Sequence, residues 1–405
     1  MQTGSNERAS QLPRRVLWMA YVVGAFGLGV SQQANFLIPL RARELGASFE
    51  VIGLIVGASA VVPTLLSVPL GGIIDRLGPR RSFIAGTSLT AVVALTFLAA
   101  TNYWTLLGLQ MVLGAVRTMA WLASQSYITS LGSAEDRASL TGRFAFFSNV
   151  GTMVGPLVAG LVAQVVGFRL AFGWLAFYAL VFAILGWMLR ETHVADVANV
   201  GASASKAKGK GAGFGTAAGH LRIRGMQVAL LLTFARLWND RLWTSFFPVY
   251  LVDVGFEPAV VGTVIFTKGL VATILAPTVG YCSRFMSRQS LAALALGFGA
   301  LGLALSPHLA VVPWVYLAPM LVGIGAGFSL PLLLSIVSDA TPDGQRGVAL
   351  GLRMTVNQVA GGTAPIIFGP LVAAFGMVFG FGAGGLFSGA VLIASRALHA
   401  VDRRR

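Results

Sequence analysis

Charged residues are scarce in this chain. Only 11% of its 405 residues are Asp, Glu, Lys or Arg, whereas 56% are hydrophobic and the mean hydropathy is +0.78. A soluble domain keeps about a quarter of its residues charged, so this composition excludes an ordinary soluble protein. The apolar residues come in blocks of about twenty, the length that crosses the hydrocarbon core as a helix, and the short alternating segments of barrel strands are missing. The sequence predicts an all-α integral membrane protein.

The chain has one cysteine and four histidines. Cys282 alone cannot form an internal disulfide, and no group of Cys and His has the spacing of metal ligands. No nucleophile–base pair, HExxH motif or carboxylate cluster indicates an enzyme, and no glycine-rich stretch reads GxxxxGK[ST]. We therefore expect no catalytic activity, no metal and no cofactor. Any transport would draw its energy from a gradient.

Acidic residues number 14 against 29 basic ones, a net charge of +15. The excess could suggest a nucleic-acid partner, but its distribution argues against one. Of the 29 Lys and Arg, 22 fall in segments assigned to one side of the membrane, three to the other and four inside the helices. This positive-inside pattern predicts the cell (inner) membrane with both termini cytoplasmic. Arg14 and Arg15 precede a long apolar stretch without a cleavage site, which predicts an uncleaved first helix.

Apolar segments alternate with short polar ones along the chain and predict twelve transmembrane helices. A Gly/Ala/Ser/Lys-rich stretch after the sixth helix reads as a flexible cytoplasmic linker. The predicted organisation is a six-helix bundle over residues 1–190, a linker over 191–225 and a second six-helix bundle over 226–405. The predicted helices are 15–40, 50–74, 82–101, 103–131, 138–165, 170–190, 226–251, 259–281, 290–306, 313–338, 347–375 and 377–400.

The two halves repeat one another. Residues of the same type recur 208 or 209 positions apart across most of six helices. Such a repeat predicts two pseudo-symmetric bundles with a site between them near the midplane, which rocking would open to each side in turn. The recurring pairs are Pro39 and Pro248, Gly46 and Gly255, Gly53 and Gly262, Pro69 and Pro277, Gly72 and Gly280, Arg76 and Arg284, Arg80 and Arg288, Gly114 and Gly323, Arg137 and Arg346, Gly142 and Gly351, Pro156 and Pro365, and Gly160 and Gly369.

The loop between the second and third predicted helices reads GGIIDRLGPRR, from Gly71 to Arg81. It resembles the G-x-x-x-D-R-x-G-R-R signature of the major facilitator superfamily, with Pro79 inserted next to the basic pair. A degenerate copy runs from Gly280 to Arg288. The resemblance covers nearly the whole chain. It implies the superfamily's fold, twelve transmembrane helices in two pseudo-symmetric six-helix bundles, and secondary transport by alternating access.

The residue types of the signature loop have physical roles. We expect Gly71 and Gly72 to let neighbouring helices come close and Gly78 to support a tight turn. The resemblance implies a contact between the signature acid, Asp75, and Arg353 near the start of the predicted helix 347–375. We predict that this pair is a latch holding the cytoplasmic side closed, the alternative being a loop that only anchors the topology. The predicted latch residues are Gly71, Asp75, Arg76, Gly78, Arg80, Arg81 and Arg353.

The predicted helix 138–165 contains the segment GTMVGPLVAG. It resembles the G-x-x-x-G-P-x-x-G-G pattern of the superfamily's proton-coupled efflux antiporters, with Ala159 in place of one glycine. Its small face permits close packing, and its proline removes one backbone donor and so allows bending. The resemblance favours export by antiport. The motif residues are Gly151, Gly155, Pro156 and Gly160.

Charged residues inside the predicted helices indicate a wet cavity, because an ionised side chain at the bilayer centre costs several kcal/mol without a partner or water. Arg236 and Asp240 are four positions apart and share a helix face, which also holds Asn239 and which we expect to line the cavity. Arg241 is turned about 100° away and would meet Lys268 only through an anion or water. The deep charged residues are Arg117, Arg236, Asp240, Arg241 and Lys268.

Asp240 is the one deeply placed acid, and we predict that it carries a coupled proton. The alternative is that it only neutralises Arg236 or Arg241. One acid cannot neutralise four bases, so we expect a positive cavity that suits an anionic or zwitterionic solute. Arg117 and Arg241 lead the candidates for carboxylate or phosphate contacts, because arginine offers a planar fork of donors. The predicted substrate-binding residues are Arg117, Arg236, Arg241, Lys268, Gln32, Asn35, Trp121, Asn239, Trp243 (on the cavity face) and Asn357.

The leading hypothesis is a secondary active transporter that exports a small organic solute with proton coupling. The alternative is an importer or exchanger of an organic anion without proton coupling, and a lipid scramblase is a third class, which would move lipid without gating. We expect a functional monomer. Its partners would be the lipid bilayer, a small-molecule solute and protons, with no nucleic acid.

Overall fold

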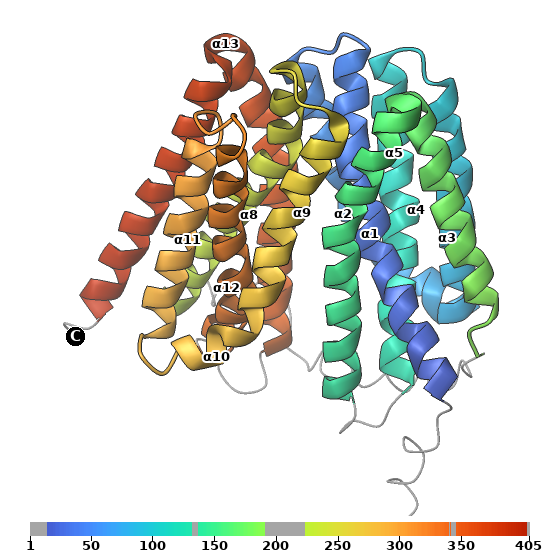
Figure 1. Cartoon of the computed structure of the whole chain (residues 1–405). Coiled ribbons are helices and arrows are strands. Elements are labelled where there is room, and N and C mark those ends of the chain that lie inside the picture. Colours follow the sequence, from blue (N-terminus) through green and yellow to red (C-terminus); the bar gives the residue numbers. More distant parts are fainter. Residues whose placement is uncertain (1–13, 132–136, 191–222, 340, 342–345, 403–405) are drawn as a thin grey trace, which may run out of the picture. The chain divides into compact units, whose positions relative to one another are not determined.

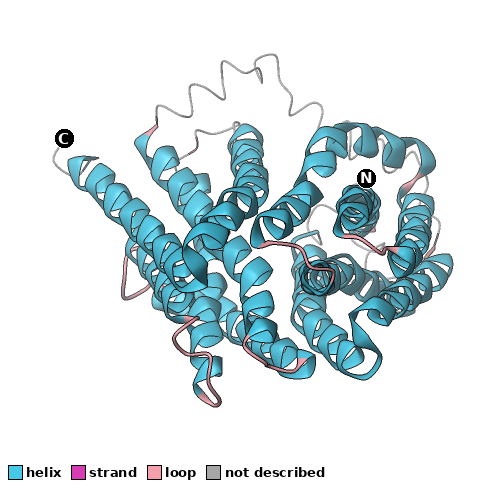
Figure 2. Cartoon of the chain, turned by 90° about the horizontal axis from the view of Figure 1, so that it is seen from above, coloured by secondary structure: helices cyan, strands magenta, loops and turns pink. Residues whose placement is uncertain are grey.

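The computed structural model describes residues 14–131, 137–190, 223–339, 341 and 346–402. Every regular element within these ranges is a helix, and they contain no strand (Figures 1 and 2). Residues 191–222, the greater part of the predicted linker, lie outside the described residues. The fold class predicted from composition, all-α and membrane-spanning, is confirmed.

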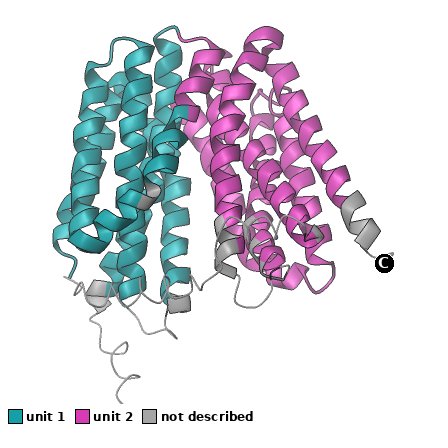
Figure 3. Ribbon diagram, turned by 180° about the vertical axis from the view of Figure 1, so that it is seen from behind, with its two compact units in different colours: residues 1–46, 58–205 teal, residues 47–57, 206–405 magenta. Residues whose placement is uncertain are grey.

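The chain divides into two compact units, which Figure 3 shows in different colours. Unit 1 comprises residues 1–46 and 58–205, and unit 2 comprises residues 47–57 and 206–405. The start of the second helix therefore groups with unit 2, a detail that the sequence did not predict. The bundle boundaries at 190 and 226 stay a prediction.

Unit 1 holds the helices that precede the predicted linker. A hydrogen-bonded asparagine cap starts one of them, because the side chain of Asn102 accepts from the backbone N–H of Thr105 at 2.8 Å. The helices are α1 (Arg14–Glu44), α2 (Phe49–Leu77, whose first turns group with unit 2), α3 (Pro79–Thr96), the short 3₁₀ helix η1 (Phe97–Ala99), α4 (Tyr103–Ser130) and α5 (Arg137–Trp187).

Unit 2 holds the remaining helices. They are α8 (Arg224–Asp253), α9 (Pro258–Leu275), η2 (Ala276–Thr278), α10 (Val279–Cys282), α11 (Arg288–Leu305), η3 (Trp314–Tyr316), α12 (Leu317–Asp339) and α13 (Arg346–Asp402).

The two longest helices, α5 and α13, each contain a break that divides the helix into two segments. Gly167 in α5 has φ +80° and Gly376 in α13 has φ +81°, a left-handed conformation that favours glycine. The two glycines are 209 positions apart, the same offset as the other repeat pairs. These breaks fall between the predicted helices 138–165 and 170–190, and between 347–375 and 377–400.

Eight helices within the described residues are long and apolar enough to cross a membrane. The windows in α5 and α13 run over 48 and 45 residues, each long enough for two crossings. The two further long helices, α1 and α8, have 31 and 30 residues. The count of twelve crossings stays a prediction.

The same helix contacts recur in the two units. In unit 1, α1 packs on α4 and α5, and α3 packs on α4 and α5; in unit 2, α8 packs on α12 and α13, and α11 packs on α12 and α13. A Cβ atom added at Gly114 would lie 2.7 Å from the carbonyl oxygen of Ser59, and one added at Gly323 would lie 2.7 Å from that of Lys268. The sequence repeat is therefore a repeat of packing, down to single close contacts between backbones.

Candidate functional site

An ion pair between α8 and α9 dominates the charged region of unit 2. The Nζ of Lys268 donates to Oδ1 of Asp240 at 2.5 Å and to Oγ1 of Thr244 at 3.0 Å. The same ammonium lies 5.1 Å from the centre of the Trp243 ring, within the range of a cation–π interaction. The side chains of Lys268 and Asp240 are 13% and 30% exposed. Lys268 is thus held from three directions, while its carboxylate partner keeps an open side.

This pairing corrects the alternative interpretation, in which Asp240 only neutralises Arg236 or Arg241. The spacing of four along α8 does place Arg236 near Asp240, and their charges interact. The hydrogen-bonded cation, however, comes from the neighbouring helix. Sequence spacing reports which residues share a face of one helix, but it does not report which residue of another helix packs against that face. The residue missed by sequence reasoning is Thr244, whose signal was its place four positions after Asp240.

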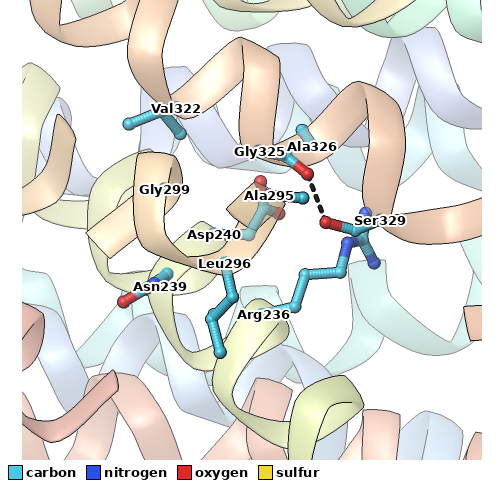
Figure 4. A pocket seen from close by; sticks show the side chains of 10 residues that line it. All are labelled: Arg236, Asn239, Asp240, Ala295, Leu296, Gly299, Val322, Gly325, Ala326 and Ser329. Atoms are coloured by element: carbon cyan, nitrogen blue, oxygen red, sulfur yellow. Dashed lines mark hydrogen bonds between the residues drawn. The ribbon is translucent and has the colours of Figure 1, made fainter. Parts of the chain in front are cut away.

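A small cavity lies inside unit 2, between α8, α11 and α12. Figure 4 shows its polar lining residues, which are Arg236, Asn239 and Asp240 of α8 and Ser329 of α12. Small residues of α11 and α12 provide the space, because a larger side chain at these positions would fill it. The lining residues are Arg236, Asn239, Asp240, Ala295, Leu296, Gly299, Val322, Gly325, Ala326 and Ser329.

The predicted cavity face of α8 is correct for Asn239 and wrong for Trp243. Asn239 lines the cavity, and its Oδ1 accepts a hydrogen bond from Ser388 at 2.7 Å. Trp243 is fully buried, and its Nε1 donates to Oγ of Ser306 at 2.9 Å. The physical reason is that an indole has one donor, and a buried serine on the adjacent helix satisfies it. Trp243 therefore belongs to the core of unit 2.

Of the other predicted residues of unit 2, Arg241 of α8 lies against α13, and Asn357 and Arg353 belong to α13. A Cβ atom added at Gly361 would lie 3.5 Å from Nε of Arg241. Asn357 is one turn before Gly361, and its amide makes only a long contact, 3.9 Å, with the sulfur of Met354. Arg353 is a further turn back and is 4% exposed. The spacing of four places Arg353, Asn357 and Gly361 on one face of α13.

The predicted residues of unit 1 lie on α1 and α4. Arg117 donates from Nη1 to the carbonyl oxygen of Ser31 at 3.4 Å, a long hydrogen bond. Trp121 packs against Phe144 with 5.6 Å between the ring centres, and a Cβ atom at Gly27 would collide with it. Gln32 and Asn35 are half-buried. These residues belong to a different unit from Asp240 and Lys268.

Gly78 makes the turn of the signature loop, as predicted. It has φ +84°, directly before α3, and Pro79 occupies the first turn of that helix. Arg80 donates from Nη2 to the carbonyl oxygen of Trp187 at 2.7 Å and lies 5.9 Å from the centre of its ring. The arginine therefore ties α3 to the end of α5.

The expectation for Gly71 and Gly72 is wrong within unit 1. A Cβ atom at either glycine would have no atom of the described residues within 4 Å, so neither is closely approached there. The side chains of Asp75, Arg76 and Arg81 are exposed. Asp75 belongs to unit 1 and Arg353 to unit 2, and the latch between them stays a prediction.

The glycine motif of α5 packs tightly against α1. A Cβ atom at Gly151 would collide with the carbonyl oxygen of Ala25, and one at Gly155 would lie 2.8 Å from that of Gly29. Pro156 and Gly160 are buried. The predicted close approach of backbones is confirmed, because no side chain larger than hydrogen fits at either of the first two positions.

Comparison with known proteins decides the family. The model of the Major Facilitator Superfamily matches residues 17–365. The chain belongs to this superfamily. It is therefore a multi-pass membrane protein of a transporter superfamily. The signature loop and the repeat had predicted this membership.

Curated relatives match the chain over part of their length. An uncharacterized MFS-type transporter of Methanocaldococcus jannaschii is 25% identical over 179 residues, which cover 44% of this chain and 45% of the relative. The multidrug resistance protein MdtG of Proteus mirabilis is 29% identical over 164 residues, which cover 38% of this chain and 40% of the relative. In each case the chain spans less than half the length of the relative.

Solved structures share the superfamily fold over the whole chain. A mutant form of the nucleoside transporter NupG has a TM-score of 0.78 at 11% identity and covers 95% of this chain and 99% of its own. A likeness at this identity shows the fold alone. Among the described residues of this superfamily member, no group of three or more His, Cys, Asp and Glu could hold a metal ion.

Proposed function

We propose that this superfamily member is a proton-coupled exporter of a small organic solute, anionic or zwitterionic, that works by alternating access. The observation that carries the proposal is the Asp240–Lys268 ion pair beside the cavity of unit 2. We place the protein, as a monomer, in the cell inner membrane with both termini in the cytoplasm. The excess of basic residues in the polar segments supports that orientation.

Coupling follows from the way Asp240 is compensated. Its carboxylate keeps its charge inside the protein because Lys268 donates to it and because the charge of Arg236 lies near. A buried carboxylate that loses its cation takes up a proton, since an isolated charge is too costly in a medium of low dielectric constant. An ammonium group of a zwitterionic solute that pairs with Asp240 takes the place of this proton, while the anionic group of the solute pairs with Lys268 or Arg236. Solute and proton therefore compete for Asp240, as the exchange of one for the other requires.

Two observations support export as the direction. The α5 motif resembles that of the antiporters, and its glycines make the tight α1–α5 contact that such a helix requires. Relatives of the chain include proteins named for multidrug resistance, and export of a compound is one way to resist it. The alternative is an importer or exchanger of organic anions, in which Asp240 only holds Lys268 in place. The open side of the carboxylate favours a group that exchanges protons over a purely structural one.

Proteoliposomes test the proposal. Labelled organic acids and phosphates are screened for accumulation driven by an imposed pH difference, and a transported compound is then measured with the variant Asp240→Asn. We expect the variant to lose pH-driven accumulation and to keep exchange of labelled for unlabelled solute. The control is Glu257→Gln, which removes an exposed acid beyond the end of α8. Intact pH-driven accumulation in Asp240→Asn would refute coupling through this residue.

A further inference from the structure

Three arginines in unit 2 have buried N–H donors that no described residue accepts. They are Nε of Arg236, Nε of Arg241, and both Nε and Nη1 of Arg353. Arg353 is 4% exposed, and no acid among the described residues forms an ion pair with it. A buried cation without a hydrogen-bonded counter-charge costs several kcal/mol. The buried Arg353 and the buried Nε atoms of the half-buried Arg236 and Arg241 call for more negative charge than the described acids supply.

The three arginines lie on the two helices α8 and α13, which pack against each other. Leu352 and Val356 flank Arg353 and pack against an apolar core that includes Ala235 of α8. Arg236, the next residue of α8, interacts electrostatically with Arg353 and with Arg241. Arg236 is therefore within electrostatic range of both other arginines.

The polar face of α13 continues this basic region toward Arg241. Asn357 lies one turn after Arg353, and its Oδ1 is buried without a hydrogen-bond partner among the described residues. Gly361 follows after another turn and leaves room for the guanidinium of Arg241, whose Nε would lie 3.5 Å from a Cβ there. A side chain at Gly361 would restrict the space in which Arg241 and a bound anion meet.

The nearest acid is already engaged. Asp240 accepts its hydrogen bond from Lys268, which is also held by Thr244 and the Trp243 ring. The carboxylate thus compensates one cation fully and the arginines only in part. Since a single carboxylate neutralises one charge, three guanidinium groups call for a ligand that carries more than one.

We propose that Arg236, Arg241 and Arg353 form an oxyanion site within unit 2 that binds a doubly charged phosphate group. Guanidinium forks match the paired oxygens of phosphate, and a dianion meets three forks better than a monocarboxylate does. Inorganic phosphate and the phosphate group of a solute share this chemistry. The inference that the transported solute carries a phosphate group rests on the proposed function. The inference that the three arginines bind phosphate does not depend on it.

Thermal unfolding of the purified full chain tests the site. Inorganic phosphate should raise the melting temperature saturably, and acetate at the same pH and ionic strength should raise it far less. The variants Arg236→Met and Arg353→Met should each weaken the apparent affinity for phosphate by about tenfold or more, the effect of losing a hydrogen bond to a charged group. The matched control is Arg396→Met, an exposed arginine on the same helix as Arg353, which should leave the affinity unchanged.

A second readout separates a binding role from a structural one. In the absence of phosphate, Arg353→Met should melt at a higher temperature than the unchanged protein, because removing an uncompensated buried charge relieves repulsion. The variant Arg353→Lys, which keeps the charge and loses the fork, covers the case in which the methionine variant does not fold, and it too should lose affinity for phosphate.

The site would be refuted by a protein whose melting temperature responds no more to phosphate than to acetate, or by arginine variants that respond like Arg396→Met. Accumulation of labelled phosphate in proteoliposomes would identify the anion as cargo, and binding without accumulation would identify it as resident; both keep the site. If phosphate does not raise the melting temperature of the unchanged protein but pH-driven transport is intact, the phosphate site is refuted and the proposed function is not. If phosphate raises the melting temperature but no compound is transported, the proposed function is refuted and the phosphate site is not.

Discussion

The two units of this transporter share a scaffold and differ in charge. Gly114 approaches the carbonyl oxygen of Ser59 in unit 1, and Gly323, 209 positions later, approaches that of Lys268 at the same 2.7 Å from the added Cβ. The residue 209 positions before Asp240 is Ser31. The ion pair of unit 2 therefore occupies the positions of two serines in unit 1.

The difference between the units shows that the repeat preserves the packing of the helices. The charged residues proposed for function occupy positions that are not needed for the close contacts between helices. The same offset pairs Gln32 with Arg241, and Arg117 with Ala326. Of the deep charged residues named above, unit 1 has one cation, Arg117, which donates to a backbone carbonyl, whereas unit 2 has three cations and an acid. If charge in unit 2 drives the transport cycle, matched substitutions in the two units must differ in effect.

The largest difference is expected between Asp240→Asn and Ser31→Ala. The first removes the acid that we propose to carry the proton and should abolish pH-driven accumulation in proteoliposomes. The second removes a hydroxyl that only donates to the carbonyl oxygen of Gly27 at 2.8 Å, so transport should stay close to that of the unchanged protein. If the two variants lost pH-driven accumulation equally, both positions would have a structural role, and the two units would not differ in function at this position.

Lys268→Met should destabilise the protein by about 1–3 kcal/mol, because it leaves the carboxylate of Asp240 without its main hydrogen-bonded cation. The partial exposure of that carboxylate and the nearby arginines keep the cost at the lower end. Asp240→Asn combined with Lys268→Met should recover most of the loss, and Ser59→Ala in unit 1 should change stability by less than about 0.5 kcal/mol. Thermal unfolding and a double-mutant cycle measure the coupling. Additive losses would mean that the pair contributes no coupling energy.

The shared scaffold predicts equal effects in the two units. Gly114→Ala and Gly323→Ala each place a Cβ within 2.7 Å of a backbone carbonyl oxygen, so each should cost about 1–3 kcal/mol of stability. Gly108→Ala and Gly297→Ala are the matched controls, since a Cβ at either meets no atom of the described residues within 4 Å, and they should be neutral or slightly stabilising. A large effect at only one of the two close contacts would contradict the repeat of packing.

The smallest effect is expected at the signature loop. Asp75→Asn removes a solvent-exposed charge from the predicted latch with Arg353. Because solvent screens that charge, the pair should contribute about 1 kcal/mol or less, and the transport cycle should slow by no more than about fivefold. Affinity for the solute should hardly change. Ser283→Ala, at the equivalent position of unit 2, should have no effect, because the degenerate loop there lacks the acid. A large loss of affinity in Asp75→Asn would contradict a latch.

The sequence by itself determined the fold class, most helix ends and the family. Blocks of apolar residues fix which segments leave water, and the recurrence of Gly46 with Gly255 identifies turns that other residues tolerate poorly; both glycines have positive φ. The turn at Gly78 and the packed face of the α5 glycines could also be predicted, because these properties depend on local backbone geometry or on the absence of a side chain.

The tertiary structure alone decided which charges meet. Periodicity placed Arg236 and Asp240 on one face of α8, but Lys268 reaches Asp240 from α9, and Trp243 turns into the core to bond with Ser306. The burial of Arg353 beside α8 was equally invisible in the sequence. Electrostatic and hydrogen-bond partners in a helical membrane protein come from neighbouring helices, and the register and rotation of those helices are set by packing rather than by spacing along one chain segment.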